Sequence, residues 1–178
     1  MKLGWLLSLA TAVAASTASG CAAGSAEAPL TIPLGLDRTA AVKSLHDHHF
    51  CEKRGSPPGK LETYPRCDRP GPEWGESWVS ARYASDGKLL ELRRYERFSD
   101  PDRAVERWNQ LVGARQKLTP ASEEALIDAR AVFLEAGTKS VKAFRIDADT
   151  VVGVFLLTPS PPDDASVLEA VVHVPARR

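Results

Sequence analysis

The sequence feature that most constrains the fold is a run of seven residues without a polar side chain, Val-Val-Gly-Val-Phe-Leu-Leu at positions 151–157. Because a β-strand sends successive side chains to opposite faces, a strand with this sequence is apolar on both faces. It needs cover on both sides and therefore an interior place in a sheet. Short polar breaks separate it from two further strand-like runs, residues 140–146 and 167–174. Connections this short predict antiparallel neighbours.

A hairpin is predicted upstream of these strands. Residues 77–84 alternate in part between apolar and polar side chains, and residues 89–98 form the returning strand. Asp86-Gly87 between them is a strong signal for a two-residue turn. Residues 30–34 are expected to add a short strand, which Pro33 would confine to the edge of the sheet.

Two helices are predicted as well. Asp37 is a good N-cap for a helix over residues 38–49. Residues 99–102, Ser-Asp-Pro-Asp, supply an N-cap, a first-turn proline and acids for a second helix. Its apolar residues recur three and four apart: Ala104, Val105, Trp108, Leu111 and Val112. Residues 121–136 fit either a helix or a strand. The predicted fold class is α+β, a single domain of residues 30–178 with helices packed on one face of an antiparallel sheet.

Composition excludes several classes of function. The chain has 178 residues, and its 23 basic and 23 acidic side chains cancel. This balance argues against a nucleic-acid partner held by bulk charge. Only the N-terminal stretch is apolar enough to enter a bilayer, which excludes a polytopic membrane protein. The sequence contains no nucleophile elbow, phosphate-binding loop or zinc-protease motif, so we expect neither an enzyme nor a cofactor.

The N-terminus predicts export. Lys2 precedes an apolar stretch over residues 3–15, and small residues follow as far as Gly20, the order of a secretory signal peptide. The sequence Ala18-Ser19-Gly20-Cys21 resembles the lipobox of bacterial lipoproteins, although Ala18 stands where that family usually has leucine. The resemblance covers residues 1–21. It implies removal of residues 1–20 and attachment of acyl chains, palmitate among them, to Cys21.

The resemblance also implies a location. Residue 22 is alanine rather than the aspartate that commonly retains these lipoproteins at the inner membrane, so we expect the outer membrane, facing the periplasm. Residues 21–29 are small and poorly patterned and are expected to form a flexible tether. The alternative is ordinary cleavage after Ala18, which would leave Cys21 as a free thiol.

The number of cysteines favours acylation of Cys21. The chain has three, and an odd cysteine in an exported protein needs an explanation. If Cys21 carries lipid, Cys51 and Cys67 remain as an even pair in an oxidising compartment. They enclose a loop rich in proline and glycine, and we expect a disulfide to close it.

Three groups of side chains are candidate sites. The aromatic residues Tyr64, Trp74, Trp78 and Tyr83 gather around the disulfide loop, where we favour a small core beneath the loop, with a partner-binding surface as the alternative. His46 and His49 beside Cys51 are metal-ligand types, but a cysteine in a disulfide cannot also bind metal, so we expect no metal site. Arg93, Arg94 and Arg97 alternate with glutamates and are expected to form a solvated strand face rather than an anion site.

The order of helix, loop and hairpin, with Gly35-Leu36-Asp37 leading into Val42 and Leu45, is similar to that of the small BamE/SmpA-type outer-membrane assembly lipoproteins over residues 34–98. The chain lacks that family's glycine–proline ending after the helix, and no functional residue is carried over. The function we expect is that of a lipid-anchored cell-envelope protein, an accessory or assembly factor that acts through protein–protein contact. The alternatives are a ligand-binding or inhibitor module and an enzyme whose site the sequence does not reveal.

Overall fold

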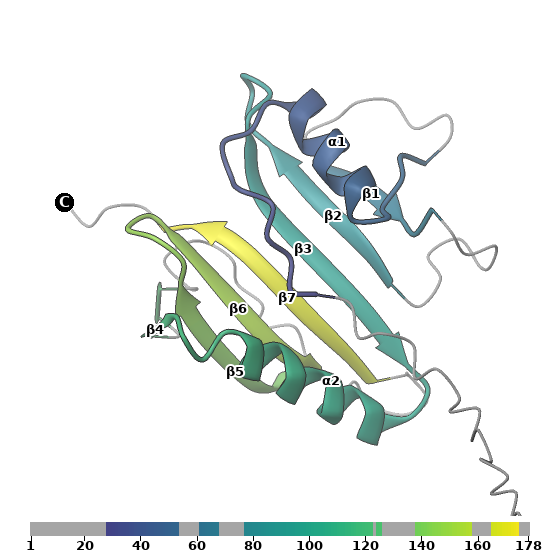
Figure 1. Ribbon diagram of the computed structural model, residues 1–178, viewed down its shortest axis with the longest axis vertical. Coiled ribbons are helices and arrows are strands. Elements are labelled where there is room, and N and C mark those ends of the chain that lie inside the picture. The colour runs from purple at the N-terminus through teal and green to yellow at the C-terminus, as the bar shows by residue number, and fades with distance from the viewer. Residues whose placement is uncertain are drawn as a thin grey trace, which may run out of the picture.

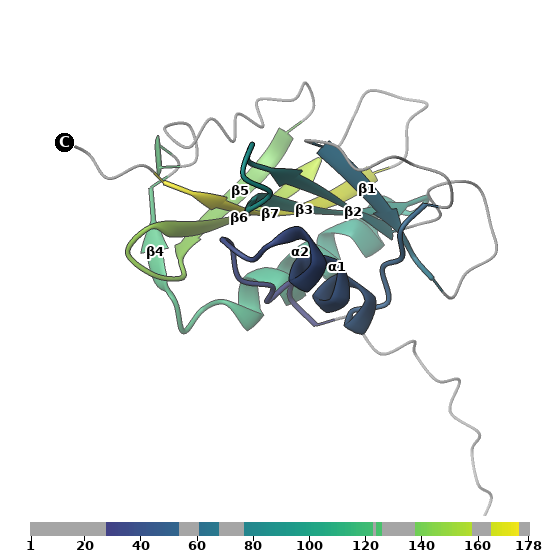
Figure 2. The same cartoon turned by 90° about the horizontal axis from the view of Figure 1, so that it is seen from above.

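Seven strands form one antiparallel sheet, and two helices cover one of its faces. The computed structural model describes residues 28–53, 61–67, 77–122, 124–125, 138–157 and 165–174. In chain order the elements are α1 (Arg38–Asp47), β1 (Leu61–Pro65), β2 (Ser77–Tyr83), β3 (Leu89–Phe98), α2 (Pro101–Ala114), β4 (Thr119–Ala121), β5 (Thr138–Arg145), β6 (Thr150–Leu157) and β7 (Ala165–His173). The strand order is β1-β2-β3-β7-β6-β5-β4. Both helices lie on one side, here called the helix face, and the opposite side is called the far face (Figures 1 and 2). The predicted fold class is confirmed.

Strand β6 is the interior strand that its sequence requires. It pairs with β5 on one side and β7 on the other, and all eight of its residues are buried. Val152, Val154 and Leu156 belong to the core on the helix face, whereas Val151, Phe155 and Leu157 belong to a second apolar cluster that includes Leu168 and Ala125. The sheet therefore has an apolar core on each face.

Strand β7 connects the hairpin of β2 and β3 with the strands β6 and β5. It lies between β3 of the upstream hairpin and β6, and pairs antiparallel with both. Its register against β3 places Leu92 opposite Val171 and Arg94 opposite Glu169. Because side chains alternate along a strand, these four residues point to the same side of the sheet. The helix face therefore contains two charged residues at its centre.

The hairpin turn is one residue longer than predicted. The Ala84 N–H donates to the carbonyl of Lys88 at 2.8 Å, so three residues, not two, form the loop. Gly87 within it has a φ of 80°. A three-residue hairpin loop places a left-handed residue at this point, which glycine adopts without steric cost.

Both predicted helices form, the first with its predicted cap Asp37 and the second with a cap, Asp100, from the predicted segment 99–102. The Asp37 carboxylate accepts from the Ala40 N–H at 2.9 Å, and the Asp100 carboxylate accepts from the Asp102 N–H at 2.9 Å. Helix α1 ends at Asp47, two residues before the predicted end. Helix α2 packs over β6, where the Trp108 indole N–H donates to the Val154 carbonyl at 3.2 Å.

The prediction of an edge strand over residues 30–34 is wrong. These residues belong to an extended segment that crosses the helix face between α1 and α2 without joining the sheet (Figure 1). We call residues 28–34 the strap. Leu30 and Ile32 are buried in the core, and Thr31 and Pro33 between them are exposed. The strap ends where Gly35 donates to the Leu89 carbonyl at 2.7 Å. Its backbone finds partners among side chains instead of a neighbouring strand.

Residues 121–136 are described only in part. Ala121 ends β4, which pairs with β5, and residues 124–125 are helical. The rest of this ambiguous stretch lies outside the described residues.

Candidate functional site

Five charged side chains are buried on the helix face beneath the strap and α2. We call them the charge cluster: Arg94 and Glu96 from β3, Arg107 and Arg115 from α2 and the residues after it, and Glu169 from β7. Arg94 and Glu169 are each only 1% exposed. Burying a charge is costly unless an opposite charge and hydrogen bonds compensate for the lost water, so the contacts of each member matter.

Glu169 is the centre of one half of the cluster. Its carboxylate pairs with the Arg94 guanidinium, Nη2 to Oε2, at 2.7 Å. Arg115 donates from Nε to its other oxygen at 2.9 Å. The carboxylate also accepts from the Leu30 backbone N–H at 3.0 Å. One buried carboxylate thus connects β7 with β3, α2 and the strap.

Glu96 is the centre of the other half. Arg107 donates to both of its oxygens, from Nε at 2.7 Å and from Nη2 at 2.8 Å, the two-pronged geometry that guanidinium and carboxylate favour. Arg94 Nε lies 3.2 Å from the same carboxylate. Arg94 therefore bridges the two glutamates, and positive and negative groups alternate through the cluster.

The cluster also binds the main chain of the strap. With three arginines and two glutamates it carries one positive charge in excess. Backbone carbonyl oxygens of the strap accept hydrogen bonds from these arginines and so offset the excess charge. Arg94 Nη1 donates to the Ala28 carbonyl at 2.8 Å, and Arg115 Nη2 donates to the Leu30 carbonyl at 3.0 Å. These contacts hold the beginning of the strap against the centre of the sheet.

The expectation of a solvated arginine face is wrong for Arg94. Alternation along β3 sends Arg94 to the helix face and leaves Arg93 half-buried and Arg97 exposed on the far face. A signal for the cluster does exist in the sequence, because Glu169 interrupts the apolar run Val-Leu-Glu-Ala-Val at positions 167–171. A lone acid in such a run requires a buried basic partner, but nothing in the sequence says which one.

An aromatic patch lies on the far face of the hairpin. The rings of Trp78 and Tyr95, which are paired across β2 and β3, stack with centroids 5.1 Å apart and planes inclined by 9°. The guanidinium of Arg97 lies 5.6 Å from the centre of the Trp78 ring, a cation–π contact. We call Trp78, Tyr95 and Arg97 the aromatic patch.

The surroundings of the aromatic patch are basic. The buried Glu91 carboxylate pairs with Arg82 at 2.7 Å and with Arg93. Together with Arg97, three arginines therefore face one glutamate on this part of the described surface. Leu61, on the edge strand β1, is 67% exposed beside them. The patch combines stacked aromatic rings, an exposed leucine and excess positive charge.

Two of the four aromatic residues, Tyr64 and Tyr83, are buried, as the core interpretation predicts, and so do not belong to a partner surface. Tyr64 and Tyr83 lie on the helix face, with their hydroxyl oxygens 3.1 Å apart. Tyr64 donates to Glu62 at 2.6 Å, and Glu62 accepts from Arg38 of α1 at 2.9 Å. Burial raises the pKa of both tyrosines. These two residues connect α1 to the hairpin, and the sheet separates them from Trp78.

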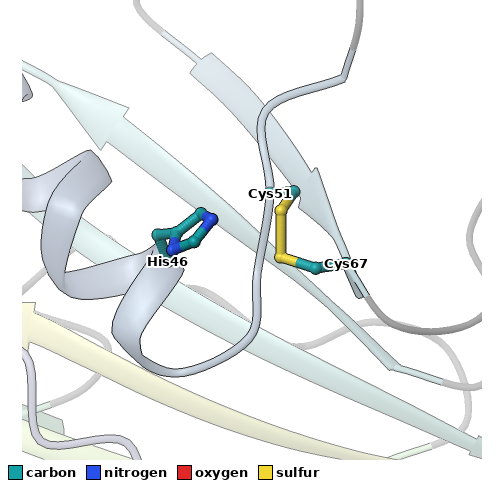
Figure 3. Close-up of side chains that lie close together, drawn as sticks. All are labelled: His46, Cys51 and Cys67. Carbon is teal, nitrogen blue, oxygen red and sulfur yellow. A yellow bond between two sulfur atoms is a disulfide. The ribbon is translucent and has the colours of Figure 1, made fainter.

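The predicted disulfide between Cys51 and Cys67 is confirmed. The chain segments that carry the two cysteines also bond directly: Cys51 donates to the Pro65 carbonyl, and Cys67 donates to the His49 carbonyl, each at 2.9 Å. Figure 3 shows His46 of α1 beside the bridge, and its ligand nitrogen and the two sulfur atoms all lie within 4.8 Å of one another. Zinc binds cysteine as the thiolate, so this group offers no such ligand while the sulfurs are bonded to each other.

Two predicted sites lie beyond the structural description. Cys21, the predicted acylation site, and Trp74 are both outside the described residues. Within the described part of the chain, neither helix has the length and apolar composition needed to span a bilayer.

Comparison of the chain with protein-family models, with curated proteins and with solved structures found no match. The function has to be inferred from the residues of this chain: the N-terminal sequence, the charge cluster beneath the strap, and the aromatic patch.

Proposed function

We propose that this is a lipid-anchored protein of the bacterial cell envelope that acts by contact with another protein. The N-terminal sequence supports the anchor, because a signal-like stretch ends in small residues before Cys21. The disulfide supports export, because such bridges persist in oxidising compartments. In this proposal Cys21 carries the acyl chains, and the domain faces the periplasm from the outer membrane.

The observation that carries the protein–protein part is the aromatic patch. Trp, Tyr and Arg are the residue types that contribute most to binding energy at protein interfaces. Here the stack of Trp78 on Tyr95, with Arg97 over the Trp78 ring, holds all three side chains in place before a partner arrives. Less side-chain freedom is then lost on binding, which favours affinity. The surrounding arginines fit a partner with acidic side chains.

The role we propose is that of an accessory or assembly factor. Its support is a surface suited to binding, together with the order of helix, loop and hairpin over residues 34–98, which resembles that of small assembly lipoproteins. A ligand-binding module or an enzyme requires polar groups that converge in a pocket, whereas the aromatic patch is a surface of stacked rings with an arginine over them.

The anchor is tested in cells with a Cys21→Ser variant. The expected result is that the natural sequence incorporates labelled palmitate and sediments with the outer membrane, whereas the variant does neither. A Cys51→Ser/Cys67→Ser double variant is the control for general effects of losing cysteines, and it should still be acylated. Membrane sedimentation of the Cys21→Ser variant would overturn the anchor.

The partner surface is tested by site-specific photo-crosslinking. A photoreactive residue at position 97 reports on the patch, and one at Val105, which is exposed on α2, reports on the other side of the sheet. We expect crosslinks to a distinct protein from position 97 and not from position 105. A Trp78→Ala substitution should abolish them. Crosslinks that are equal from the two positions, or that persist in the Trp78→Ala variant, would contradict this surface.

A further inference from the structure

We propose that the charge cluster is a clamp that sets the orientation of the domain on the membrane, with the aromatic patch turned away from the lipid and toward a partner. The inference rests on the proposed anchor at Cys21 and adds to it the direction in which the domain faces.

The clamp fixes the first described residues of the chain to the middle of the sheet. The Ala28 carbonyl, the Leu30 N–H and the Leu30 carbonyl each bond to a buried charged side chain, and these come from β3, β7 and the end of α2. The Leu30 side chain is itself buried, at 1% exposed. Three parts of the fold that are distant in sequence therefore hold the same two residues of the strap, Ala28 and Leu30.

The length of chain before the clamp is short. Six residues, 22–27, separate Cys21 from Ala28. At 3.3–3.6 Å for each residue, seven steps along a fully extended chain span at most about 25 Å. A lipid-bearing Cys21 can therefore lie no farther than this from the Ala28–Arg94 contact.

This limit favours one side of the sheet. The strap lies on the helix face (Figure 2), and its first residue, Ala28, bonds to Arg94 of β3. To reach the far face, the chain would have to pass the end of β3 at Phe98, four residues or about 14 Å from Arg94. It would then have to cross the sheet layer, for which we take the spacing of packed sheets, about 10 Å. That path uses the whole length of the extended chain between Cys21 and Ala28. Reaching a bilayer on the helix side requires only passage through the helix layer.

The clamp is what keeps the connection short. Without it, the chain would be free from Cys21 to Gly35, where the backbone next bonds to the hairpin at Leu89. The seven further residues, 28–34, would add about 25 Å of reach and double the span. Either face of the sheet could then rest against the lipid, and the aromatic patch would be covered part of the time.

The test uses energy transfer on vesicles. The chain that begins at Cys21 is coupled at that residue to a maleimide lipid, because the other two cysteines are bonded to each other. A donor dye on an unnatural amino acid is placed at Arg97 on the far face or at Asn109, which is exposed on α2. The acceptor dye is carried by lipid headgroups. We expect more transfer from position 109 than from position 97.

The decisive variant is an insertion of eight glycine and serine residues between Gly24 and Ser25, which leaves the domain unchanged. We expect it to remove the difference between the two dye positions. Equal transfer from both positions in the chain of natural length, or a difference that survives the insertion, would overturn the inference.

The clamp itself is tested by hydrogen exchange in the full chain. The Leu30 amide donates to a buried carboxylate, so it should exchange only at the slow rate of global unfolding. Fast exchange at Leu30 would overturn the clamp. Because the lipid is attached chemically, these measurements do not depend on natural acylation. Failure of palmitate labelling in cells would overturn the proposed anchor and leave the geometry measured on vesicles intact.

Discussion

Arg115, the residue that follows α2, donates to Glu169 in the middle of β7, Nε to Oε1 at 2.9 Å, and both side chains are buried. The same guanidinium donates to the Leu30 carbonyl at 3.0 Å. This pair therefore connects three segments that are far apart in sequence: the strap, the end of a helix and an interior strand. The helix face is held together by charge as well as by apolar packing.

Neutralising Glu169 should destabilise the protein strongly. A Glu169→Gln substitution keeps the shape of the side chain but leaves Arg94 and Arg115 buried without their shared counter-charge. Removing one partner of a buried pair costs about 3–5 kcal/mol. Urea unfolding at neutral pH should show a loss of this size in the free energy of unfolding. Glu106→Gln, an exposed change on α2, is the matched control and should stay within about 0.5 kcal/mol of the natural sequence.

Truncating Leu30 should separate the contribution of the strap from that of the charges. Leu30→Ala leaves a cavity in the core on the helix face and should cost about 2–5 kcal/mol of unfolding free energy. Thr31→Ala changes an exposed neighbour and should have little effect. Equal stabilities of the two variants by urea unfolding would show that the strap does not belong to the core.

Opening the disulfide should weaken the fold without destroying it. The bridge spans 16 residues in sequence, and on the chain-entropy model a loop of this size contributes about 3 kcal/mol. The backbone bonds at Cys51 and Cys67 remain after reduction, so the reduced protein should still unfold cooperatively. Unfolding curves with and without reductant measure the difference. Ready alkylation of both cysteines in unreduced exported protein would refute the bridge.

The buried tyrosines make stability fall at alkaline pH. Burial, with the hydrogen bond to Glu62, raises the pKa of Tyr64 above its ordinary value of 10.0, and burial raises the pKa of Tyr83. The unfolded chain then loses these protons before the folded protein does. Their contribution is therefore complete below pH 10 and lost progressively as the pH rises further.

The raised pKa of the two buried tyrosines can be tested by absorbance. The chain has three tyrosines. In an absorbance titration at alkaline pH, Tyr64 and Tyr83 should ionise together with unfolding rather than before it. Tyr64→Phe and Tyr83→Phe variants should each remove one tyrosine from that cooperative step. Ionisation of both residues in protein that is still folded would contradict their burial.

Local sequence patterns determined much of the architecture. The apolar run at positions 151–157 required an interior strand, because only cover on both faces removes all of its side chains from water. The caps Asp37 and Asp100 located the starts of both helices, since their side chains satisfy backbone donors within a few residues. The disulfide could also be predicted locally, because Cys51 and Cys67 are an even pair that encloses a short loop in a chain predicted to be exported.

The tertiary structure alone decided what lies on each face of the sheet. Residues 30–34 have the composition of a strand, but they became part of the strap because Glu169 and Arg115 on the helix face bond to the backbone of Leu30, and Arg94 bonds to that of Ala28 just before it. The aromatic residues Tyr64 and Trp78 are close in sequence, but strand alternation and register sent them to opposite faces. A sequence specifies the period of each element. Which strands pair, and in which register, decides which charges and rings meet. This pairing depends on contacts between residues tens of positions apart, and these exist only once the chain has folded.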